Sequence, residues 1–204
     1  MRTGRKVSIA AIGYLLGSIP SADLVGRLVG TDVRSRGTGN PGAANATAVL
    51  GFRFGAAVAG LDIAKGWAAG ALGQRISPTM ANVAGTAAVI GHVFPIWSGF
   101  VGGKGVATSY GVVLATFPAY AVPDALVAGA AAKATGDPFT ANLIASAAWT
   151  GTATLWWRRR LPNLWGPTPT AALPISAAAI SLLLTWRMRR PDRVTDGERF
   201  GQMR

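Results

Sequence analysis

Two glycine-rich stretches of the sequence carry side chains suited to binding an anionic group. The first, residues 34–45, reads Arg-Ser-Arg-Gly-Thr-Gly-Asn-Pro-Gly-Ala-Ala-Asn. Glycine lets the backbone turn its N–H groups inward, short polar side chains add hydrogen bonds, and the two arginines supply positive charge. The residues that would do so are Gly37, Thr38, Gly39, Asn40, Gly42 and Asn45. This chemistry fits phosphate, and the alternative is a simple turn between two helices.

The second stretch, residues 102–108, reads Gly-Gly-Lys-Gly-Val-Ala-Thr and directly precedes an apolar segment. A glycine-rich turn that opens a helix offers free N–H groups and the positive end of the helix dipole to an anion. Gly102, Gly103 and Gly105 would form that turn, Lys104 adds a point charge, and Thr108 adds a hydroxyl one turn later. The spacing differs from the nucleotide-binding P-loop motif, and the alternative is a flexible basic loop. Two such stretches on one face predict two phosphate-bearing ligands, or one ligand that spans both.

Three further ionisable residues lie in apolar surroundings. Asp62 and Lys65 are three positions apart and so share one helix face; charged side chains inside a membrane usually pair in the protein interior, and we interpret them as an internal ion pair. His92 is the single histidine, a candidate phosphate ligand or proton shuttle, although packing or loop support is the favoured role. With one histidine and no cysteine, the sequence predicts no metal site and no disulfide.

The elements that must position these residues are predicted to be membrane helices. Half of the residues are hydrophobic and 14% are charged, about half the charged fraction of a soluble domain. This composition excludes disorder. The apolar segments span residues 7–28, 51–73, 78–97, 106–116, 118–134, 139–157 and 170–186. We therefore predict an all-α, polytopic membrane bundle of about seven transmembrane helices, forming a single domain over residues 1–204, in which the fourth and fifth segments could also be one broken span.

The distribution of charge predicts the orientation in the membrane. The net charge is +12, which admits nucleic acid, anionic lipid or anionic substrates as partners; the apolar content counts against nucleic acid. The loops that share a side with the C-terminus hold the larger number of Lys and Arg, so the N-terminus is expected outside and the C-terminus in the cytoplasm. The first segment follows a basic start, as a signal peptide does, but it continues past Pro20, and we expect it to stay uncleaved.

Five segments, in this order and with this spacing, resemble one known family. They read Gly-Tyr-Leu-Leu-Gly-Ser-Ile-Pro, Arg-Gly-Thr-Gly-Asn-Pro-Gly-Ala-Ala-Asn, Leu-Asp-Ile-Ala-Lys-Gly, Gly-His-Val-Phe-Pro and Gly-Gly-Lys-Gly-Val-Ala-Thr. Their positions are residues 13–20, 36–45, 61–66, 91–95 and 102–108. They are similar to the bacterial acyl-phosphate:glycerol-3-phosphate acyltransferases, the PlsY family. Beyond residue 116 the likeness is one of hydropathy, with a weak echo at Arg193, Gly197 and Glu198.

The resemblance implies a fold, a reaction and a location. The family has seven membrane helices with the N-terminus outside, and its motif loops are cytoplasmic, in the plasma or inner membrane of a bacterium. It transfers an acyl chain from acyl phosphate to the 1-hydroxyl of glycerol 3-phosphate, forming lysophosphatidic acid for phospholipid synthesis without metal or other cofactor. By position, residues 102–105 would hold the glycerol phosphate and the first stretch the reacting phosphate. Thr38 and Lys104 are then the expected catalytic contacts, and Asn40, Asn45, His92 and Thr108 the expected substrate-binding side chains beside the glycines.

Several positions depart from the family pattern. This chain has Thr38 where the family has Ser, Ala48 where it has Arg, and Val101 where it has Lys. Arg187 and Arg190 stand where the family has His and Asn. An arginine can bind phosphate but cannot serve as a general base. Two functions therefore stand side by side: an active acyltransferase, or a non-catalytic paralogue that binds lipid phosphates or membrane partners. A small transporter is a third reading, but paired broken helices in two matching halves are absent from the sequence.

Overall fold

The structure, a computed structural model, describes residues 3–190 and 192, and this part of the chain is helical without a strand. Its elements are α1 (Thr3–Gly17), α2 (Ser21–Leu28), α3 (Ala43–Leu50), α4 (Phe52–Gln74), α5 (Pro78–Val93), the 3-10 turn η1 (Ile96–Ser98), α6 (Val106–Thr116), α7 (Pro118–Thr135), α8 (Pro138–Arg159) and α9 (Ala172–Arg189). The predicted all-α class is confirmed. Each predicted apolar segment corresponds to one long helix, apart from the first.

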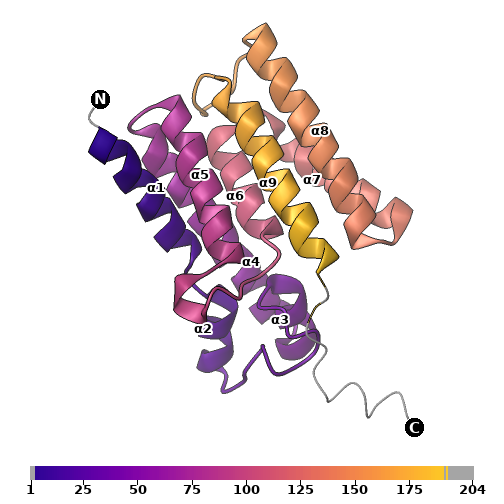
Figure 1. The fold of residues 1–204 in the computed structure, drawn as a ribbon. Helices are drawn as coiled ribbons and strands as arrows, with labels where there is room; N and C mark the ends of the chain where they lie inside the picture. Colours follow the sequence, from indigo (N-terminus) through magenta and orange to yellow (C-terminus); the bar gives the residue numbers. More distant parts are fainter. Residues whose placement is uncertain (1–2, 191, 193–204) are drawn as a thin grey trace.

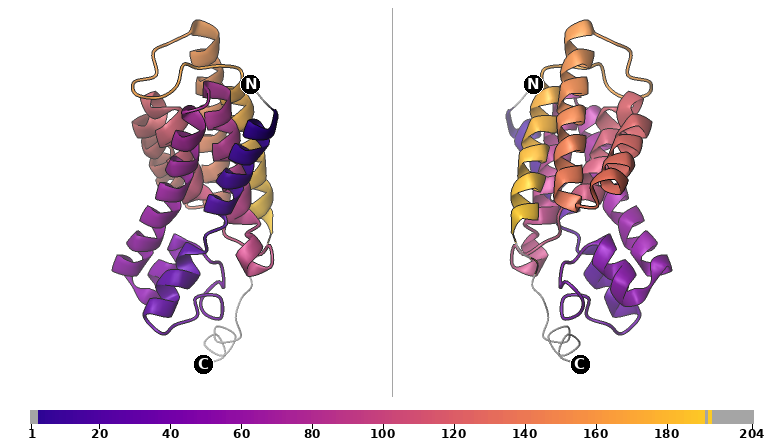
Figure 2. Two further views of the ribbon diagram at one scale, coloured as in Figure 1. Left: turned by 90° about the vertical axis from the view of Figure 1, so that its left-hand side faces the viewer. Right: turned by 90° about the vertical axis from the view of Figure 1, so that its right-hand side faces the viewer.

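The long helices stand side by side, and the short helices α2 and α3 lie at one end of them (Figure 1). The same end holds the N-terminal part of α4 and the C-terminal end of α9, whereas α1 begins at the opposite end (Figure 2). We call the end with α2 and α3 the loop end. By length and composition, two stretches of the described chain are apolar and long enough to cross a membrane, Ser8–Leu28 and Pro78–Ser98. The expected seven spans therefore remain a prediction.

The first predicted span, residues 7–28, is divided between the two helices α1 and α2. The chain breaks between α1 and α2 at residues 18–20, because Pro20 has no N–H to continue the helix and adopts φ −84° and ψ 74°. The Ser18 hydroxyl donates to the Tyr14 carbonyl, 2.8 Å away, and so satisfies part of the end of α1. The break turns α2 out of the bundle and into the layer at the loop end (Figure 1).

Small residues bring the helix backbones together. Gly13 and Gly17 of α1 lie directly against the backbone of Ala84 and Ala88 in α5, where a Cβ atom would collide. Gly66 of α4 meets the Thr108 carbonyl of α6 in the same way. Close backbone approach of this kind replaces hydrophobic drive in a lipid environment. The larger core cluster, which includes Phe117, Leu173 and Ile180, fills the space between α5, α6, α7, α8 and α9.

Candidate functional site

The two glycine-rich stretches meet at the loop end, as predicted. Arg187 near the end of α9 joins them: its Nη2 lies 3.4 Å from the Asn40 Oδ1 atom and donates to the Gly102 carbonyl at 3.2 Å. Arg34 makes a second link, because its Nη1 donates to the Val101 carbonyl at 2.7 Å. Segments far apart in the sequence are thus held in one place by two arginine side chains.

The first stretch is folded around Asn45, in the first turn of α3. The Asn45 amide nitrogen donates to the carbonyls of Val33 and Arg36, at 2.8 and 3.2 Å, and its Oδ1 accepts from the Thr38 N–H at 2.9 Å. Asn45 is buried, so its amide shapes the loop instead of facing a ligand, which corrects its expected substrate-binding role. Thr38 is exposed at the loop surface, and its hydroxyl accepts from the Asn40 N–H at 3.4 Å.

Glycine is required twice in this loop by its backbone conformation. Gly37 has φ +56° and Gly39 has φ +67°, a region that other residues enter only at a cost. The N–H groups of Gly39 and Gly42 donate to the carbonyls of Arg36 and Asn40, at 3.1 and 2.9 Å. The expectation that these two N–H groups face an anion was therefore wrong, and the glycines shape the turn. Gly42 caps the N-terminus of α3 in an extended conformation, and Asn40 is buried between this loop and Arg187.

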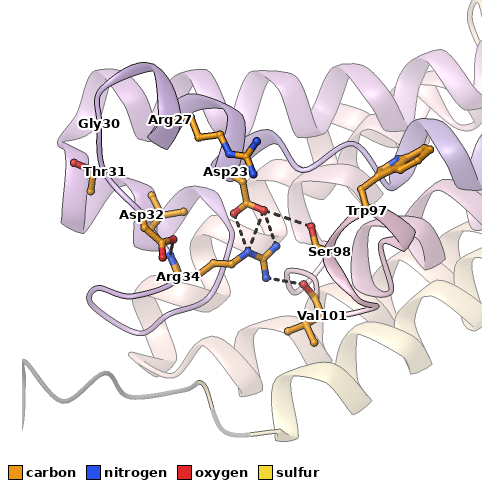
Figure 3. A pocket seen from close by; sticks show the side chains of 10 residues that line it. Asp23, Arg27, Gly30, Thr31, Asp32, Arg34, Trp97, Ser98 and Val101 are labelled. Atoms are coloured by element: carbon orange, nitrogen blue, oxygen red, sulfur yellow. Dashed lines mark hydrogen bonds and ion pairs between the residues drawn. The ribbon is translucent and has the colours of Figure 1, made fainter.

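Arg34 is held by a carboxylate of α2. Its Nε lies 2.9 and 3.0 Å from the two Asp23 oxygens, and its Nη2 lies 2.8 Å from Oδ2. Ser98 approaches the same carboxylate at 3.5 Å. Figure 3 shows these side chains meeting on one wall of a cavity of about 680 Å³, which Trp97 and Arg27 also line. Because its charge is paired in a bidentate geometry, Arg34 positions the loops.

The second stretch closes over the end of α5. The N–H of Gly102 donates to the Val93 carbonyl at 3.1 Å, and that of Gly103 to the His92 carbonyl at 3.2 Å. The expectation that both N–H groups are free for an anion was therefore wrong: they satisfy the carbonyls at the end of a helix. A Cβ at Gly103 would collide with the His92 imidazole, so these glycines serve close approach.

The second stretch ends at the start of α6, where anion binding stays a prediction. Gly105 caps it with φ +88°, and no side chain makes a capping hydrogen bond there. Thr108, expected to reach a ligand, is completely buried and lies against Gly66 of α4, so it belongs to the helix interface. The Lys104 ammonium reaches the Asp192 carboxylate, with Nζ 2.7 Å from Oδ2.

The predicted internal ion pair is present beneath the loops. Lys65 Nζ lies 2.8 Å from Asp62 Oδ1 and donates to the Ile19 carbonyl at 2.9 Å. The Ser21 hydroxyl donates to the same Asp62 oxygen at 2.8 Å, and His92 Nδ1 lies 3.5 Å from it. His92 thus supports the loops from below, as favoured in the sequence analysis. The pairing of His92 and Ser21 with Asp62 could not be found from spacing, because the residues come from α5, α2 and α4.

A small cavity lies between this buried cluster and the loops. Its volume is about 10 Å³, the space of roughly one water molecule. The polar side chains and glycines that line it are Ser21, Arg34, Lys65, His92, Gly17, Gly102 and Gly103. The site therefore combines a buried Lys65–His92 floor with the two loops above. The echo at Arg193, Gly197 and Glu198 lies outside the described residues.

Comparison with known proteins identifies the family. A family model described as glycerol-3-phosphate acyltransferase matches residues 7–194. A glycerol-3-phosphate acyltransferase of Myxococcus xanthus is 42% identical over 152 residues, 72% of this chain and 79% of the relative. One of Bacillus velezensis is 50% identical over 105 residues, 50% of this chain and 54% of the relative.

Two solved structures of PlsY, an integral membrane glycerol 3-phosphate acyltransferase, share the fold. The glycerol 3-phosphate form matches with a TM-score of 0.76 and 28% identity, over 98% of this chain and 92% of the other. The lysophosphatidic acid form matches with a TM-score of 0.73 over the same shares. On the family match and the identity to its relatives, this chain belongs to the glycerol-3-phosphate acyltransferase family.

Proposed function

We propose that this chain transfers a fatty acyl group from acyl phosphate to the 1-hydroxyl of glycerol 3-phosphate, forming lysophosphatidic acid and inorganic phosphate. The observation that carries the proposal is the junction at Arg187, which holds Asn40 of the first stretch and Gly102 of the second within hydrogen-bonding reach. Two phosphate groups must meet in this reaction, and the junction supports it by bringing both loops together. The relatives' names and the glycerol 3-phosphate form of PlsY support the same acceptor.

The chemistry requires charge stabilisation more than proton transfer. The glycerol hydroxyl oxygen attacks the acyl carbonyl carbon, the bond from that carbon to the phosphate oxygen breaks, and the hydroxyl proton leaves with the phosphate. Donors aimed at the developing oxyanion and at the leaving group are usually the largest catalytic contribution. We assign the phosphate contacts to Lys104 and to the exposed Thr38 hydroxyl; the start of α6, where no side chain makes a capping hydrogen bond, directly follows Lys104. No metal or other cofactor takes part in this scheme.

An apolar groove between α1, α5 and α9 is our candidate for the acyl chain. It has a volume of about 660 Å³ and is lined along α5 from Thr79 to Ile90, a length of about 16 Å at 1.5 Å per residue. Ile90 comes two residues before His92, so the groove extends from the far end of the bundle toward the loop end. Small side chains such as Ala87 and Ala179 keep it open. The lysophosphatidic acid form of PlsY supports a lipid ligand in this fold.

We place the protein in the plasma or inner membrane of a bacterium, with the loop end in the cytoplasm. Two observations support this orientation. The first described helix begins at the end of the bundle opposite to the loops (Figure 2), and the predicted cytoplasmic side carries the excess of Lys and Arg. Glycerol 3-phosphate and acyl phosphate are then the soluble and lipid-borne partners, and the surrounding lipids are the third.

A non-catalytic paralogue remains the second candidate, favoured by Ala48. This residue is exposed on α3, where the resemblance would place an arginine beside the reacting phosphate. Losing a charge-assisted contact weakens phosphate binding, so a chain without it could bind lipid phosphate without turnover.

One assay separates the two functions. Purified full-length protein in lipid vesicles receives radiolabelled glycerol 3-phosphate and palmitoyl phosphate, and labelled lysophosphatidic acid is measured. We expect turnover in the wild type and a loss of at least about 100-fold in Lys104→Ala, the scale of removing one group that stabilises transition-state charge. Arg53 is an exposed cation of α4. Arg53→Ala is therefore the matched control and should retain activity. Folded wild-type protein without product above background would refute the enzyme and favour the paralogue.

A further inference from the structure

The Asp192 carboxylate lies between two cations of the candidate site. Lys104 Nζ is 2.7 Å from Asp192 Oδ2, and Arg187 Nη1 is 4.0 Å from Asp192 Oδ1. The three side chains are largely shielded from solvent, with 32%, 14% and 19% of the Lys104, Arg187 and Asp192 side chains exposed. Lys104 belongs to the second glycine-rich stretch and Arg187 to α9, so both cations converge on one anion from separate elements.

The carboxylate fits this position poorly. Only its Oδ2 atom makes a close contact, with Lys104, while Oδ1 is buried and lacks a hydrogen-bond partner among the described residues. A buried acceptor left unpaired is unfavourable. Arg187 uses its Nη2 to hold Asn40 and Gly102, which leaves Nη1 directed at the anion. A phosphate group has more oxygens than a carboxylate, and it can contact both cations at once.

We propose that Lys104 and Arg187 together form a phosphate-binding pair, and that Asp192 occupies this pair until a phosphate group displaces it. Arg187 thereby becomes a binding residue of this chain, at a position where the resemblance aligns a histidine. Asp192 acts as an internal competitor that sets the apparent affinity for phosphate. The identity of the phosphate compound rests on the proposed function, whereas the binding pair itself does not.

The displacement is tested by calorimetric titration of inorganic phosphate into full-length protein in lipid nanodiscs. Asp192→Asn removes the competing charge and should lower the Kd for phosphate about tenfold, the equivalent of one charge-assisted hydrogen bond. Arg187→Gln should raise the Kd by a similar factor. Arg189→Gln is the matched control: this arginine lies over the Phe139 ring, 5.4 Å from its centroid, and its removal should change the Kd by less than about twofold.

Folding is checked separately by thermal unfolding of each variant without phosphate. Asp192→Ser serves as a second test of the carboxylate, and Arg187→Lys, which keeps the charge but not the fork of donors, should bind phosphate with intermediate Kd. A wild-type Kd in both folded Asp192 variants overturns the competition. A wild-type Kd in folded Arg187→Gln overturns the binding pair.

Steady-state kinetics identify which phosphate compound uses the pair. A lower KM of Asp192→Asn for glycerol 3-phosphate assigns the pair to the acceptor, and a lower KM for palmitoyl phosphate assigns it to the donor. Unchanged KM values for both substrates contradict the proposal. The titration needs no turnover. An inactive wild type would refute the proposed function, whereas the phosphate-binding pair is judged by the titration alone.

Discussion

The His92 imidazole occupies the space that a Cβ atom would need at Gly103, and the Gly103 N–H donates to the His92 carbonyl at 3.2 Å. Through His92 this contact reaches Asp62 of α4, whose Oδ1 lies 3.5 Å from the imidazole Nδ1. The second glycine-rich stretch therefore packs directly against the buried polar cluster. Because Lys104 follows Gly103, its position depends on this packing.

Gly103→Ala should displace the loop. The added methyl group must push against a buried imidazole, and overpacking of this kind costs about 1–3 kcal/mol. We expect a lower thermal unfolding temperature and a large loss of acyl transfer, because Lys104 moves with the loop. Gly60→Ala on α4 is the matched control: a Cβ at Gly60 meets open space, and alanine favours the helix by about 0.5–1 kcal/mol. Wild-type activity and stability in Gly103→Ala would contradict this packing.

The long helices could be predicted from the sequence because each is a continuous apolar stretch. The predicted segment at residues 106–116 has the bounds of α6, and the segment at 139–157 lies within α8. Pro20 was visible in the sequence, but the residues on both sides of it are apolar, so hydropathy predicted one continuous segment across the break. Helix α3 has only 8 residues, which is too short for a helical periodicity of apolar residues to be recognised next to a polar stretch.

The meeting of the two glycine-rich stretches was predicted, whereas their contacts were predicted only in part. Glycine spacing and charge indicated two phosphate-binding loops on one face, and Arg187 brings them together. The sequence could not show that Gly102 and Gly103 donate to the end of α5, because that requires the tertiary position of residues 92 and 93. For the same reason the Asp192 contact with Lys104 was not anticipated: it links segments that only the fold brings together.

The buried pair of Asp62 and Lys65 predicts non-additive effects on stability. Asp62→Asn leaves the Lys65 ammonium without its carboxylate in a buried site, and breaking one partner of such a pair costs about 3–5 kcal/mol. Lys65→Met leaves the carboxylate in the same position. We expect the double variant to be more stable than either single variant. The measurement is a double-mutant cycle of unfolding free energies in detergent. Additive losses in that cycle would show that the pair contributes no coupling.

We expect a small pH dependence of stability from Asp137 at the start of α8. Its side chain caps the helix, accepting from the Thr140 hydroxyl at 2.6 Å and from the N–H groups of Thr140 and Phe139 at 2.8 and 3.2 Å. These hydrogen bonds, with that from the Thr140 hydroxyl foremost, lower the pKa of the Asp137 carboxyl.

A lowered pKa in the folded state stabilises the protein above the ordinary carboxyl pKa, and this contribution is lost as pH falls through the lowered value. Asp137→Asn still caps the helix but cannot ionise, so its stability should fall less on acidification than that of the wild type. Thermal unfolding from neutral to acidic pH tests this, with Asp137→Ala as the variant that loses the cap at every pH. Parallel pH curves for wild type and Asp137→Asn would argue against a shifted carboxyl.

The groove between α1, α5 and α9 predicts a chain-length effect. Ala87 lines it midway along α5, and Ala87→Phe would fill the groove without touching the loop end. The KM for palmitoyl phosphate should rise about tenfold, which corresponds to about 1.4 kcal/mol of lost binding, while octanoyl phosphate, which needs less of the groove, should be affected less. Ala130→Phe on the exposed side of α7 controls for added bulk. An equal rise in KM for both donors would mean that the acyl chain lies elsewhere than in this groove. The phosphate contacts assigned to the loops, Arg187 and Lys104 do not depend on this result.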